Sequence, residues 1–287
     1  MYDIKMIKTP KLAIFDVDGT IATKAIVPEE ILDGIRHLHS RGCMTTISTG
    51  RGYIRLKDSL GEKFNEIVSD DALIIIEHGT KIVNKTGEII FGEYLSEEEK
   101  KHIIDFARIN IELFKVIWYN PADVSKKVQI WVADERYVQS ETEYRGHYAN
   151  LFTSPIGVLE QQLLENNITN VTLRFKEHVK VENLKLAFTK TDTSIIFQDG
   201  NMEFVKNNIN KGISVLYLAK KLAVSSEDML IPGNAINDIE MLDLGTGISV
   251  LVGPKEERTT IESYLSDPGS LVKIDSPVEL GKYLQTL

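Results

Sequence analysis

The sequence of 287 residues predicts an α/β fold, in which a doubly wound parallel-sheet core is interrupted by an inserted α+β cap domain. At both ends of the chain, short apolar runs alternate with helical stretches, as in parallel sheets that helices cover on both faces. This alternation of predicted strands and helices stops near residue 85 and resumes after residue 205. We therefore assign 1–84 and 206–287 to a discontinuous core domain, and 85–205 to the inserted domain.

The first part of the core reads as strand, helix, strand, helical linker and strand. Residues 12–15 form an apolar run, and the helix in "VPEEILDGIRHLHSRG" begins at Pro28 and ends at Gly42. The stretches "CMTTISTGR" and "ALIIIEHG" are expected to be the second and third buried strands. This alternation predicts that all three strands belong to one parallel sheet.

The inserted domain is expected to have a small sheet of its own. "TGEIIFGEYL" is typical of an antiparallel edge, and Ser96 with Glu99 forms a capping box for the next helix. "KKVQIWVAD" and "NVTLRFKE" are predicted strands, and "SIIFQDGNMEFV" predicts a hairpin that turns at Asp199 and Gly200.

The α/β rhythm returns in the last part of the chain. We expect a helix in "KGISVLYLAKKL", a strand in "DMLIPG", a helix in "NDIEMLDL" and a strand in "GISVLVG". A final helix begins after Ser276, with Pro277 in its first turn and Glu279 completing a capping box. A domain inserted between two halves of a core can act as a lid over their shared site.

Composition indicates a soluble cytoplasmic protein. The net charge of −9 argues against nucleic acid as a partner, because such binding depends on neutralising phosphates. The single cysteine, Cys43, excludes an internal disulfide framework and suits a reducing compartment, where we expect it to be a core residue. No segment approaches the ~18 apolar residues of a membrane helix, so no membrane partner is expected.

Two carboxylates follow the first predicted strand, in "KLAIFDVDGT". Asp16 ends the apolar run, Asp18 comes two residues later and Gly19 marks a turn. Ligands in open α/β sheets bind beyond the carboxyl ends of the strands. The two carboxylates would repel each other there unless a cation, a proton or a reaction used them.

Four short segments at predicted strand ends or on adjoining turns carry the candidate chemistry. They are "DVDGT" at 16–20, "STGR" at 48–51, "NKG" at 210–212 and "GNAIND" at 233–238. Carboxylate and amide oxygens suit Mg²⁺, and a hydroxyl, free backbone N–H groups and a lysine can hold a phosphoryl group. A carboxylate can also attack phosphorus and form an aspartyl-phosphate.

These four segments, in this order and with a domain inserted between the second and third, resemble the haloacid dehalogenase (HAD) superfamily. The closer resemblance is to its Cof-type sugar-phosphatase branch. The resemblance implies a HAD-like, Rossmannoid core, with Asp16 as the nucleophile and Asp18 as the acid and base whose backbone carbonyl helps to ligate Mg²⁺. Thr49 matches the hydroxyl that binds the phosphoryl group, and Gly50 and Arg51 complete the "TGR" motif as candidate substrate contacts.

The resemblance also assigns the remaining site residues. Lys211 matches the lysine that neutralises the nucleophile and the phosphate, and Asn237 with Asp238 matches the "ND" pair. The implied metal ligands are Asp16, Asp18, Asp238 and the residue after Gly233. That residue is Asn234 here, where the family's "GDxxND" pattern has aspartate. An amide oxygen can ligate Mg²⁺ without adding negative charge, so Asn234 predicts weaker metal binding.

The resemblance implies a Mg²⁺-dependent phosphatase that hydrolyses small phosphorylated metabolites, such as sugar phosphates, through an aspartyl-phosphate. Two alternatives stay open. A phosphomutase of the same superfamily would return the phosphoryl group to its substrate, and a protein weakened by Asn234 would only bind a phosphorylated metabolite. In the inserted domain, Trp118, Tyr119 and Trp131 either pack in the interior or line a sugar pocket.

Overall fold

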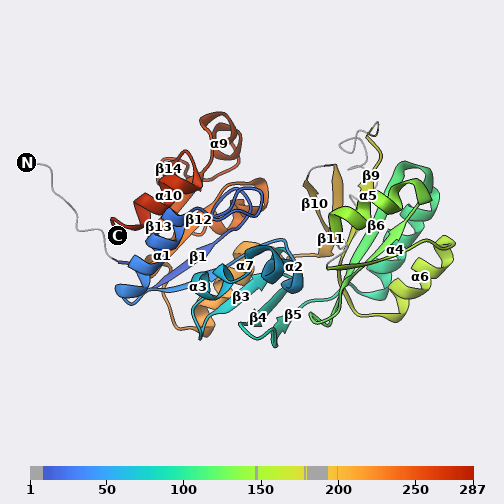
Figure 1. Ribbon diagram of the computed structural model, residues 1–287, viewed down its shortest axis with the longest axis horizontal. Helices are drawn as coiled ribbons and strands as arrows, with labels where there is room; N and C mark the ends of the chain where they lie inside the picture. The colour runs from blue at the N-terminus through green and yellow to red at the C-terminus, as the bar shows by residue number, and fades with distance from the viewer. Residues whose placement is uncertain (1–8, 146–147, 178, 180–192, 199) are drawn as a thin grey trace, which may run out of the picture. The chain divides into compact units, whose positions relative to one another are not determined.

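The structure is a computed structural model, which describes residues 9–145, 148–177, 179, 193–198 and 200–287. The chain divides into two compact units (Figure 1). The first contains residues up to Arg51, Leu56–Ile90 and Asn210–Leu287, and the second contains Gly52–Arg55 and Phe91–Ile209. The predicted fold class, a parallel-sheet core with an inserted α+β unit, is confirmed.

A five-stranded sheet forms the centre of the first unit, in the order β14-β13-β12-β1-β2 with every neighbouring pair parallel. Its strands are β1 (Leu12–Phe15), β2 (Met44–Ile47), β12 (Met229–Gly233), β13 (Ile248–Val252) and β14 (Val272–Ile274). All four residues of β1 are fully buried. An apolar run of this kind forms a central strand because helices cover both of its faces.

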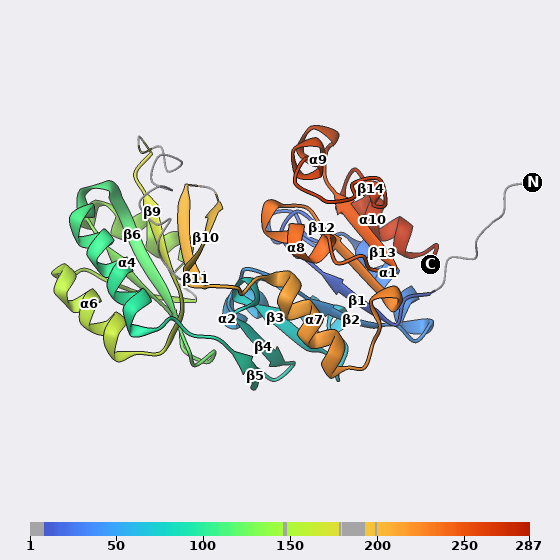
Figure 2. The same ribbon diagram turned by 180° about the vertical axis from the view of Figure 1, so that it is seen from behind.

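Helices pack on both faces of this sheet. The helices of the first unit are α1 (Glu29–Ser40), α2 (Tyr53–Leu60), whose first three residues belong to the second unit, α3 (Lys63–Ile67), α7 (Lys211–Lys221), α8 (Ile239–Leu242), α9 (Lys255–Glu262) and α10 (Pro277–Leu284). Helix α1 packs against α10 on the side nearer the viewer in Figure 1, and α7 packs against α8 on the side nearer the viewer in Figure 2.

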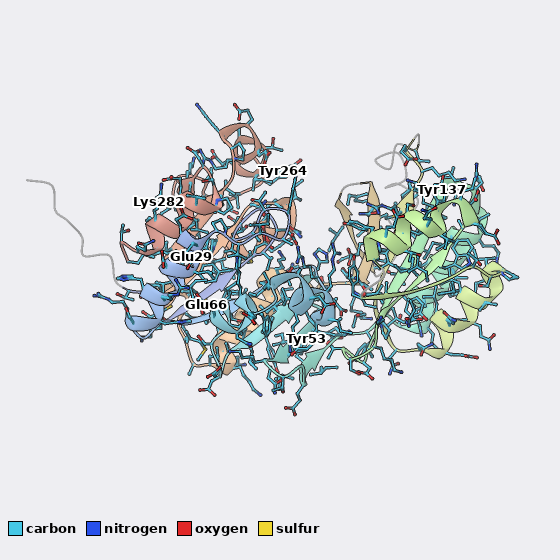
Figure 3. All side chains as sticks on the ribbon, viewed as in Figure 1. Glu29, Tyr53, Glu66, Tyr137, Tyr264 and Lys282 are labelled. Carbon is cyan, nitrogen blue, oxygen red and sulfur yellow. The ribbon has the colours of Figure 1, made fainter. Side chains whose placement is uncertain are left out.

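Polar contacts fix two of these helices. Arg36 on α1 pairs with Glu29 at 2.8 Å and with Glu66 of α3 at 2.7 Å, and both glutamates are labelled in Figure 3. At α10, the hydroxyl of Ser276 accepts the N–H of Glu279 at 3.3 Å, as the capping box requires. The Glu279 carboxylate pairs with Lys282 at 2.8 Å, so the predicted return bond of the box is replaced by an ion pair.

The expected third strand of the parallel sheet lies elsewhere. Strand β3 (Leu73–Ile76) pairs antiparallel with β4 (Lys81–Asn84), in a separate three-stranded sheet that ends with β5 (Ile89–Gly92). A single parallel bridge between Ser48 and Ile75 connects it to the end of β2. The prediction is therefore right about the parallel direction of β3 beside β2 and wrong about its sheet, because the short return through η1 (Glu77–Gly79) pairs β3 antiparallel with β4.

The second unit has a six-stranded sheet in the order β10-β11-β9-β6-β7-β8. Its strands are β6 (Phe114–Pro121), β7 (Val128–Val132), β8 (Ala149–Phe152), β9 (Ile168–Phe175), β10 (Thr193–Gln198) and β11 (Asn201–Lys206). Its helices are α4 (Glu97–Ile109), α5 (Val138–Arg145) and α6 (Ile156–Glu165). Ser96 and Glu99 form the predicted capping box of α4. Strands β10 and β11 form the predicted hairpin, but Asp199 lies outside the described residues.

Two of the three aromatic residues noted in this unit pack in its interior. Tyr119 and Trp131 are each 3% exposed and belong to the main apolar core beside Leu159 and Leu163 of α6. Trp118 points to the opposite face of the sheet. None of the helices in the described ranges has both the length and the apolar character that crossing a membrane requires.

Candidate active site

The candidate residues meet at the carboxyl edge of the parallel sheet, where the strand order reverses. Strand β1 lies between β2, which follows it in the chain, and β12, which begins more than two hundred residues after β1. Chain connections leave β1 in both directions at this point, which is the ligand-binding position of open α/β sheets. Asp16 follows β1, Thr49 follows β2 and Asn234 follows β12.

Asp16 is held by two donors in a buried position. Its Oδ1 accepts from Lys211 Nζ at 2.7 Å and its Oδ2 accepts from the Thr20 hydroxyl at 2.9 Å. The residue is 5% exposed. Burial, followed by the charge of Asp238, raises the pKa of Asp16 to about 6, although Lys211 and Thr20 oppose the shift.

Lys211 bridges two carboxylates. Its Nζ donates to Asp16 Oδ1 at 2.7 Å and to Asp238 Oδ1 at 2.6 Å, and the side chain is 1% exposed. The first turn of α7 positions it, because the Asn210 side chain caps this helix by accepting the N–H of Ile213 at 2.9 Å. Burial opposes the charged form, but the two carboxylates raise the pKa of Lys211 above its usual value.

Asp238 is fully buried, and both of its oxygens already accept hydrogen bonds. Oδ1 accepts from Lys211, and Oδ2 accepts the backbone N–H groups of Asn234 at 2.9 Å and Ala235 at 3.0 Å. The carboxylate therefore fixes the turn after β12 and holds Lys211 next to Asp16. In this arrangement Asp238 supports the site by positioning its neighbours.

Arg51 contacts Asp18. Its Nε and Nη2 donate to the two oxygens of Asp18 at 2.8 and 2.5 Å, and its Nη1 contacts the hydroxyl of Ser59. Arg51 is 8% exposed, whereas the Asp18 side chain is 54% exposed. A planar fork of this kind fixes the orientation of a carboxylate. The structure thus places Arg51 on the predicted acid and base, and not at a separate position facing substrate.

The turn after β2 is closely packed. The Thr49 hydroxyl is buried and accepts the N–H of Arg51 at 3.2 Å. A Cβ atom at Gly50 would lie 2.3 Å from the ring of His78, so any larger residue there would require His78 to move. His78 Nδ1 in turn lies 3.4 Å from Asn237 Nδ2, which brings Asn237 to this side of the site.

Two residues of this site were not predicted from the sequence. Thr20 holds Asp16, and its place as the last residue of "DVDGT" is the signal that could have identified it. His78 is buried and adopts a left-handed backbone conformation with φ of 57°, which is uncommon for a residue other than glycine. The sequence feature that could have identified His78 is its position in the turn after a buried strand, where residues of functional sites are often found.

The oxygen atoms around Thr20 fit a hard divalent cation. The Thr20 hydroxyl lies 2.9 Å from Asp16 Oδ2 and 3.1 Å from Asn234 Oδ1, so a carboxylate and an amide oxygen face one point. Gly19, with φ of 87°, leaves the space that the Asn234 side chain occupies. Across the described ranges, no three His, Cys, Asp or Glu side chains gather as a metal-binding group. The set suits Mg²⁺, with less negative charge than a site built from carboxylates alone.

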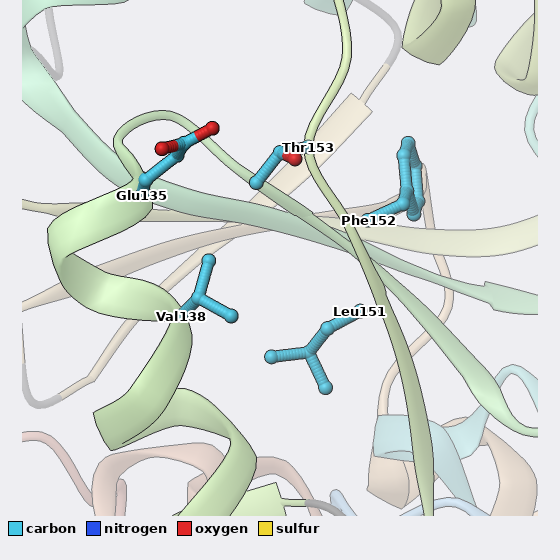
Figure 4. A pocket seen from close by; sticks show the side chains of 5 residues that line it. All are labelled: Glu135, Val138, Leu151, Phe152 and Thr153. Carbon is cyan, nitrogen blue, oxygen red and sulfur yellow. The ribbon is translucent and has the colours of Figure 1, made fainter.

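Figure 4 shows a separate pocket, which lies within the second unit. It is lined by Glu135, Val138, Leu151, Phe152 and Thr153, from the turn that leads into α5, the start of α5, the end of β8 and the residue after β8. The lining contains neither a cation nor any of the site residues predicted from the sequence. This pocket is therefore distinct from the constellation around Asp16.

Comparison with known proteins agrees with this geometry. The profile of the haloacid dehalogenase-like hydrolase family matches residues 13–261. The chain is 24% identical over 250 residues to an HMP-PP phosphatase of Escherichia coli O157:H7, covering 83% of this chain and 82% of that protein. This chain belongs to the haloacid dehalogenase-like hydrolase family.

Solved structures share the fold over nearly the whole chain. A HAD/COF-like hydrolase from Plasmodium vivax is 19% identical, covers 97% of this chain and 95% of its own, and has a TM-score of 0.77. A HAD subclass IIB sugar phosphatase is 17% identical, covers 96% and 98%, and has a TM-score of 0.73. The Cof-type HAD resemblance found in the motifs is confirmed, as is the predicted enzyme class, a phosphoric monoester hydrolase.

Proposed function

We propose that the protein is a Mg²⁺-dependent phosphatase that hydrolyses small phosphorylated metabolites, sugar phosphates among them, through an aspartyl-phosphate on Asp16. The observation that carries this proposal is the position of Lys211, 2.7 Å from Asp16 Oδ1 and 2.6 Å from Asp238 Oδ1. A buried lysine offsets the repulsion between the nucleophilic carboxylate and a dianionic ester. The HMP-PP phosphatase of Escherichia coli and the HAD subclass IIB sugar phosphatase support the proposal, because the phosphorylated compounds in their names fall within the class that we propose.

In the first step, an oxygen of Asp16 attacks phosphorus while the bond from phosphorus to the ester oxygen breaks. Asp18 gives a proton to that departing oxygen, so the products are an alcohol and the aspartyl-phosphate. Both oxygens of Asp18 accept from Arg51 in this structure. Proton delivery therefore requires these two contacts to loosen, which the exposed position of Asp18 allows.

In the second step, water attacks the phosphorus of the aspartyl-phosphate and Asp18 accepts the proton of that water. Inorganic phosphate leaves and the Asp16 carboxylate is restored. The Thr49 hydroxyl, the N–H groups of the Gly50 turn and Lys211 bind the phosphoryl oxygens, and Asn237 contributes from the turn after β12. Arg51 positions Asp18 during both steps.

Mg²⁺ would be held by Asp16 and Asn234, and the family resemblance adds Asp18 and Asp238. When bound, it supplies positive charge that stabilises the phosphoryl oxygens. We further propose that residues 85–205 serve as a cap that excludes water from the reaction and selects the substrate.

A panel of phosphorylated sugars and related metabolites, assayed with and without Mg²⁺, tests the proposal. We expect Mg²⁺-dependent release of inorganic phosphate from some of them, and none from the Asp16→Asn variant, because an amide is a poor nucleophile toward phosphorus. An isomerised phosphosugar in place of inorganic phosphate would identify a phosphomutase. Binding without turnover would identify the weakened binding protein that Asn234 suggests.

A further inference from the structure

The turn η1 between β3 and β4 has a strained backbone. Glu77, His78 and Gly79 are consecutive residues with φ values of 51°, 57° and 98°, all in the left-handed region. Two adjacent residues other than glycine are uncommon there, because the Cβ atom crowds the following carbonyl oxygen. Strain of this kind persists only where the surrounding structure enforces it, and it is concentrated at functional sites. The contacts of η1 therefore indicate its role.

Buried contacts hold η1 in this conformation. The Glu77 carboxylate pairs with Lys81 Nζ at 3.0 Å, and the two side chains are 3% and 0% exposed. On the other side of the turn, the Ser214 hydroxyl of α7 donates to the carbonyl oxygen of Gly79 at 2.7 Å. The turn is therefore anchored both to β4 and to the helix that carries Lys211.

The backbone of η1 orients the turn after β2. The N–H of His78 donates to the carbonyl oxygen of Thr49, and the N–H of Glu77 donates to that of Arg51, both at 3.1 Å. Every peptide bond within the described ranges is trans, so the C=O of Thr49 and the N–H of Gly50 point in opposite directions. The bond to Thr49 therefore directs the Gly50 N–H away from η1, as the binding of a phosphoryl oxygen requires.

The His78 side chain contacts two of the segments that bind the phosphoryl group in the proposed function. Its ring occupies the space that a side chain at Gly50 would fill, since a Cβ atom there would lie 2.3 Å from Cε1 and Nε2. Its Nδ1 lies 3.4 Å from Asn237 Nδ2, in the turn after β12. An amide nitrogen only donates, so Nδ1 is the acceptor in this contact. All of these residues belong to the first unit.

We propose that His78 is a positioning residue of the phosphoryl site, which keeps the Gly50 turn and the Asn237 amide in place relative to each other. The left-handed conformation of η1 lets its backbone bond to the turn after β2 while the imidazole contacts both segments, which explains why a strained turn lies here. His78 acts through its two neighbours and not on the reacting atoms. The inference rests on the proposed function, because it gives His78 a role in binding the phosphoryl group of the substrate.

Three substitutions separate the two contacts of His78. Asparagine has an amide oxygen near the position of Nδ1 but no group over Gly50, glutamine reaches the position of Nε2 but has no acceptor at that of Nδ1, and alanine has neither. We expect His78→Ala to lower kcat/KM for para-nitrophenyl phosphate by about 10- to 100-fold, because a displacement of about 1 Å in a binding group can cost about 100-fold in rate. His78→Asn and His78→Gln should each recover part of this loss.

His39→Ala is the matched control. His39 lies in the same unit, and its Nε2 lies 2.7 Å from the hydroxyl oxygen of Thr45, at the opposite end of β2 from Thr49. Its kcat/KM should equal that of the unchanged protein. A loss below about tenfold in His78→Ala, or no recovery in either conservative variant, overturns the proposal. Recovery in only one of them supports it and identifies the contact that positions the site.

Every rate is expressed per folded protein, with the folded fraction measured by hydrogen exchange of the backbone amides in β1, so that a merely structural effect leaves kcat/KM unchanged. If His78→Ala does not fold, the two conservative variants decide. At least one of them should then lose about three- to tenfold, and a kcat/KM equal to that of the control in both overturns the proposal.

Calorimetric binding of inorganic phosphate in the presence of Mg²⁺ separates this inference from the phosphatase function. Phosphate binding that is at least about tenfold weaker in His78→Ala and unchanged in His39→Ala supports the positioning role even if no ester is hydrolysed, in which case the proposed phosphatase function alone fails. Hydrolysis of phosphate esters, with kcat/KM and phosphate affinity equal in the two alanine variants, supports the phosphatase function and refutes the role of His78.

Discussion

Removing the charge of Lys211 should destabilise the first unit because two buried carboxylates lose their shared partner. We consider Lys211→Met, which keeps the length of the side chain. Lys211 Nζ lies 2.7 Å from Asp16 Oδ1 and 2.6 Å from Asp238 Oδ1, so these oxygens are separated by at most the sum, 5.3 Å. At an effective dielectric constant of about 20, their repulsion is at least about 3 kcal/mol. Loss of one partner from a buried ion pair typically costs about 3–5 kcal/mol, so we expect a destabilisation in that range.

A second substitution makes the reasoning specific. Asp238 Oδ2 accepts both backbone N–H groups of the turn, so the oxygen of an asparagine can keep both bonds. Asp238→Asn alone should destabilise the protein, because its amide N–H₂ would face Lys211. In the Lys211→Met background the same change should restore about 2–3 kcal/mol, because it removes the repulsion. The effect of Asp238→Asn on the free energy of unfolding is therefore expected to have opposite signs in the two backgrounds: destabilising with Lys211 present and stabilising with Met at position 211.

The stability of the first unit is measured by urea unfolding at neutral pH, with hydrogen exchange of the backbone amides in β1 and β12 as the probe. Trp118 and Trp131, the two tryptophans of the chain, lie in the second unit, so their fluorescence provides an internal reference. The control is Lys282→Met, at an exposed pair with Glu279, where a loss below about 1 kcal/mol is expected. A cost below about 1 kcal/mol for Lys211→Met, or a double variant less stable than Lys211→Met alone, would refute the account.

Three further predictions concern single residues. Asp18→Asn should lose much more kcat on alkyl phosphates than on an aryl phosphate, whose leaving group needs less protonation; equal losses would show that Asp18 acts mainly in structure or metal binding. Asn234→Asp should lower the Mg²⁺ concentration for half-maximal activity by about ten- to a hundredfold, since the amide lacks a charge worth roughly 1–3 kcal/mol, and an unmoved Mg²⁺ titration would remove Asn234 from the metal shell. Burial raises the pKa of Cys43 to about 12, so a thiol reagent should label the native protein at least about a hundredfold more slowly than the unfolded chain, and equal labelling rates would contradict its buried position.

The sequence was sufficient to predict that the chemistry-bearing segments meet. Asp16, Thr49 and Asn234 follow three strands that the sequence predicts, and the carboxyl ends of parallel strands share one edge of a sheet. Lys211 lies beside these residues because its helix begins at the same edge of the sheet, where Asn210 caps it. These inferences needed only strand direction and helix starts, which local patterns specify well.

Local patterns did not specify which sheet a buried strand joins. The run Leu73–Ile76 is as apolar as Leu12–Phe15, yet it makes only one parallel bridge to the end of β2 and pairs along its length with β4. Strand β6, next to β9 inside the second sheet, was not predicted at all. In "FKVIWYNP" apolar side chains face both sides, because one side packs in the main core and the other lies under α5, so the period-two alternation is lost.

Side-chain partners were the least predictable part of the site, and Arg51 shows why. A sequence that reads "TGR" after a strand places this arginine near the phosphoryl group, but its guanidinium reaches Asp18 across a separation of 33 residues. Ser59, on α2, accepts a hydrogen bond from the third guanidinium nitrogen. The orientation of the guanidinium therefore depends on a helix that lies outside the motif. The motif therefore predicts the backbone position of Arg51, but the partners of its guanidinium depend on the packing of α2. The same reasoning applies to Asp238. The motif predicts that its carboxylate ligates a metal, but its two oxygens accept hydrogen bonds from Lys211 and from the turn after β12. Each functional group in this site is assigned a role by its contacts with the neighbouring segments, which is why substitutions at those contacts, and not only at Asp16, test the proposed chemistry.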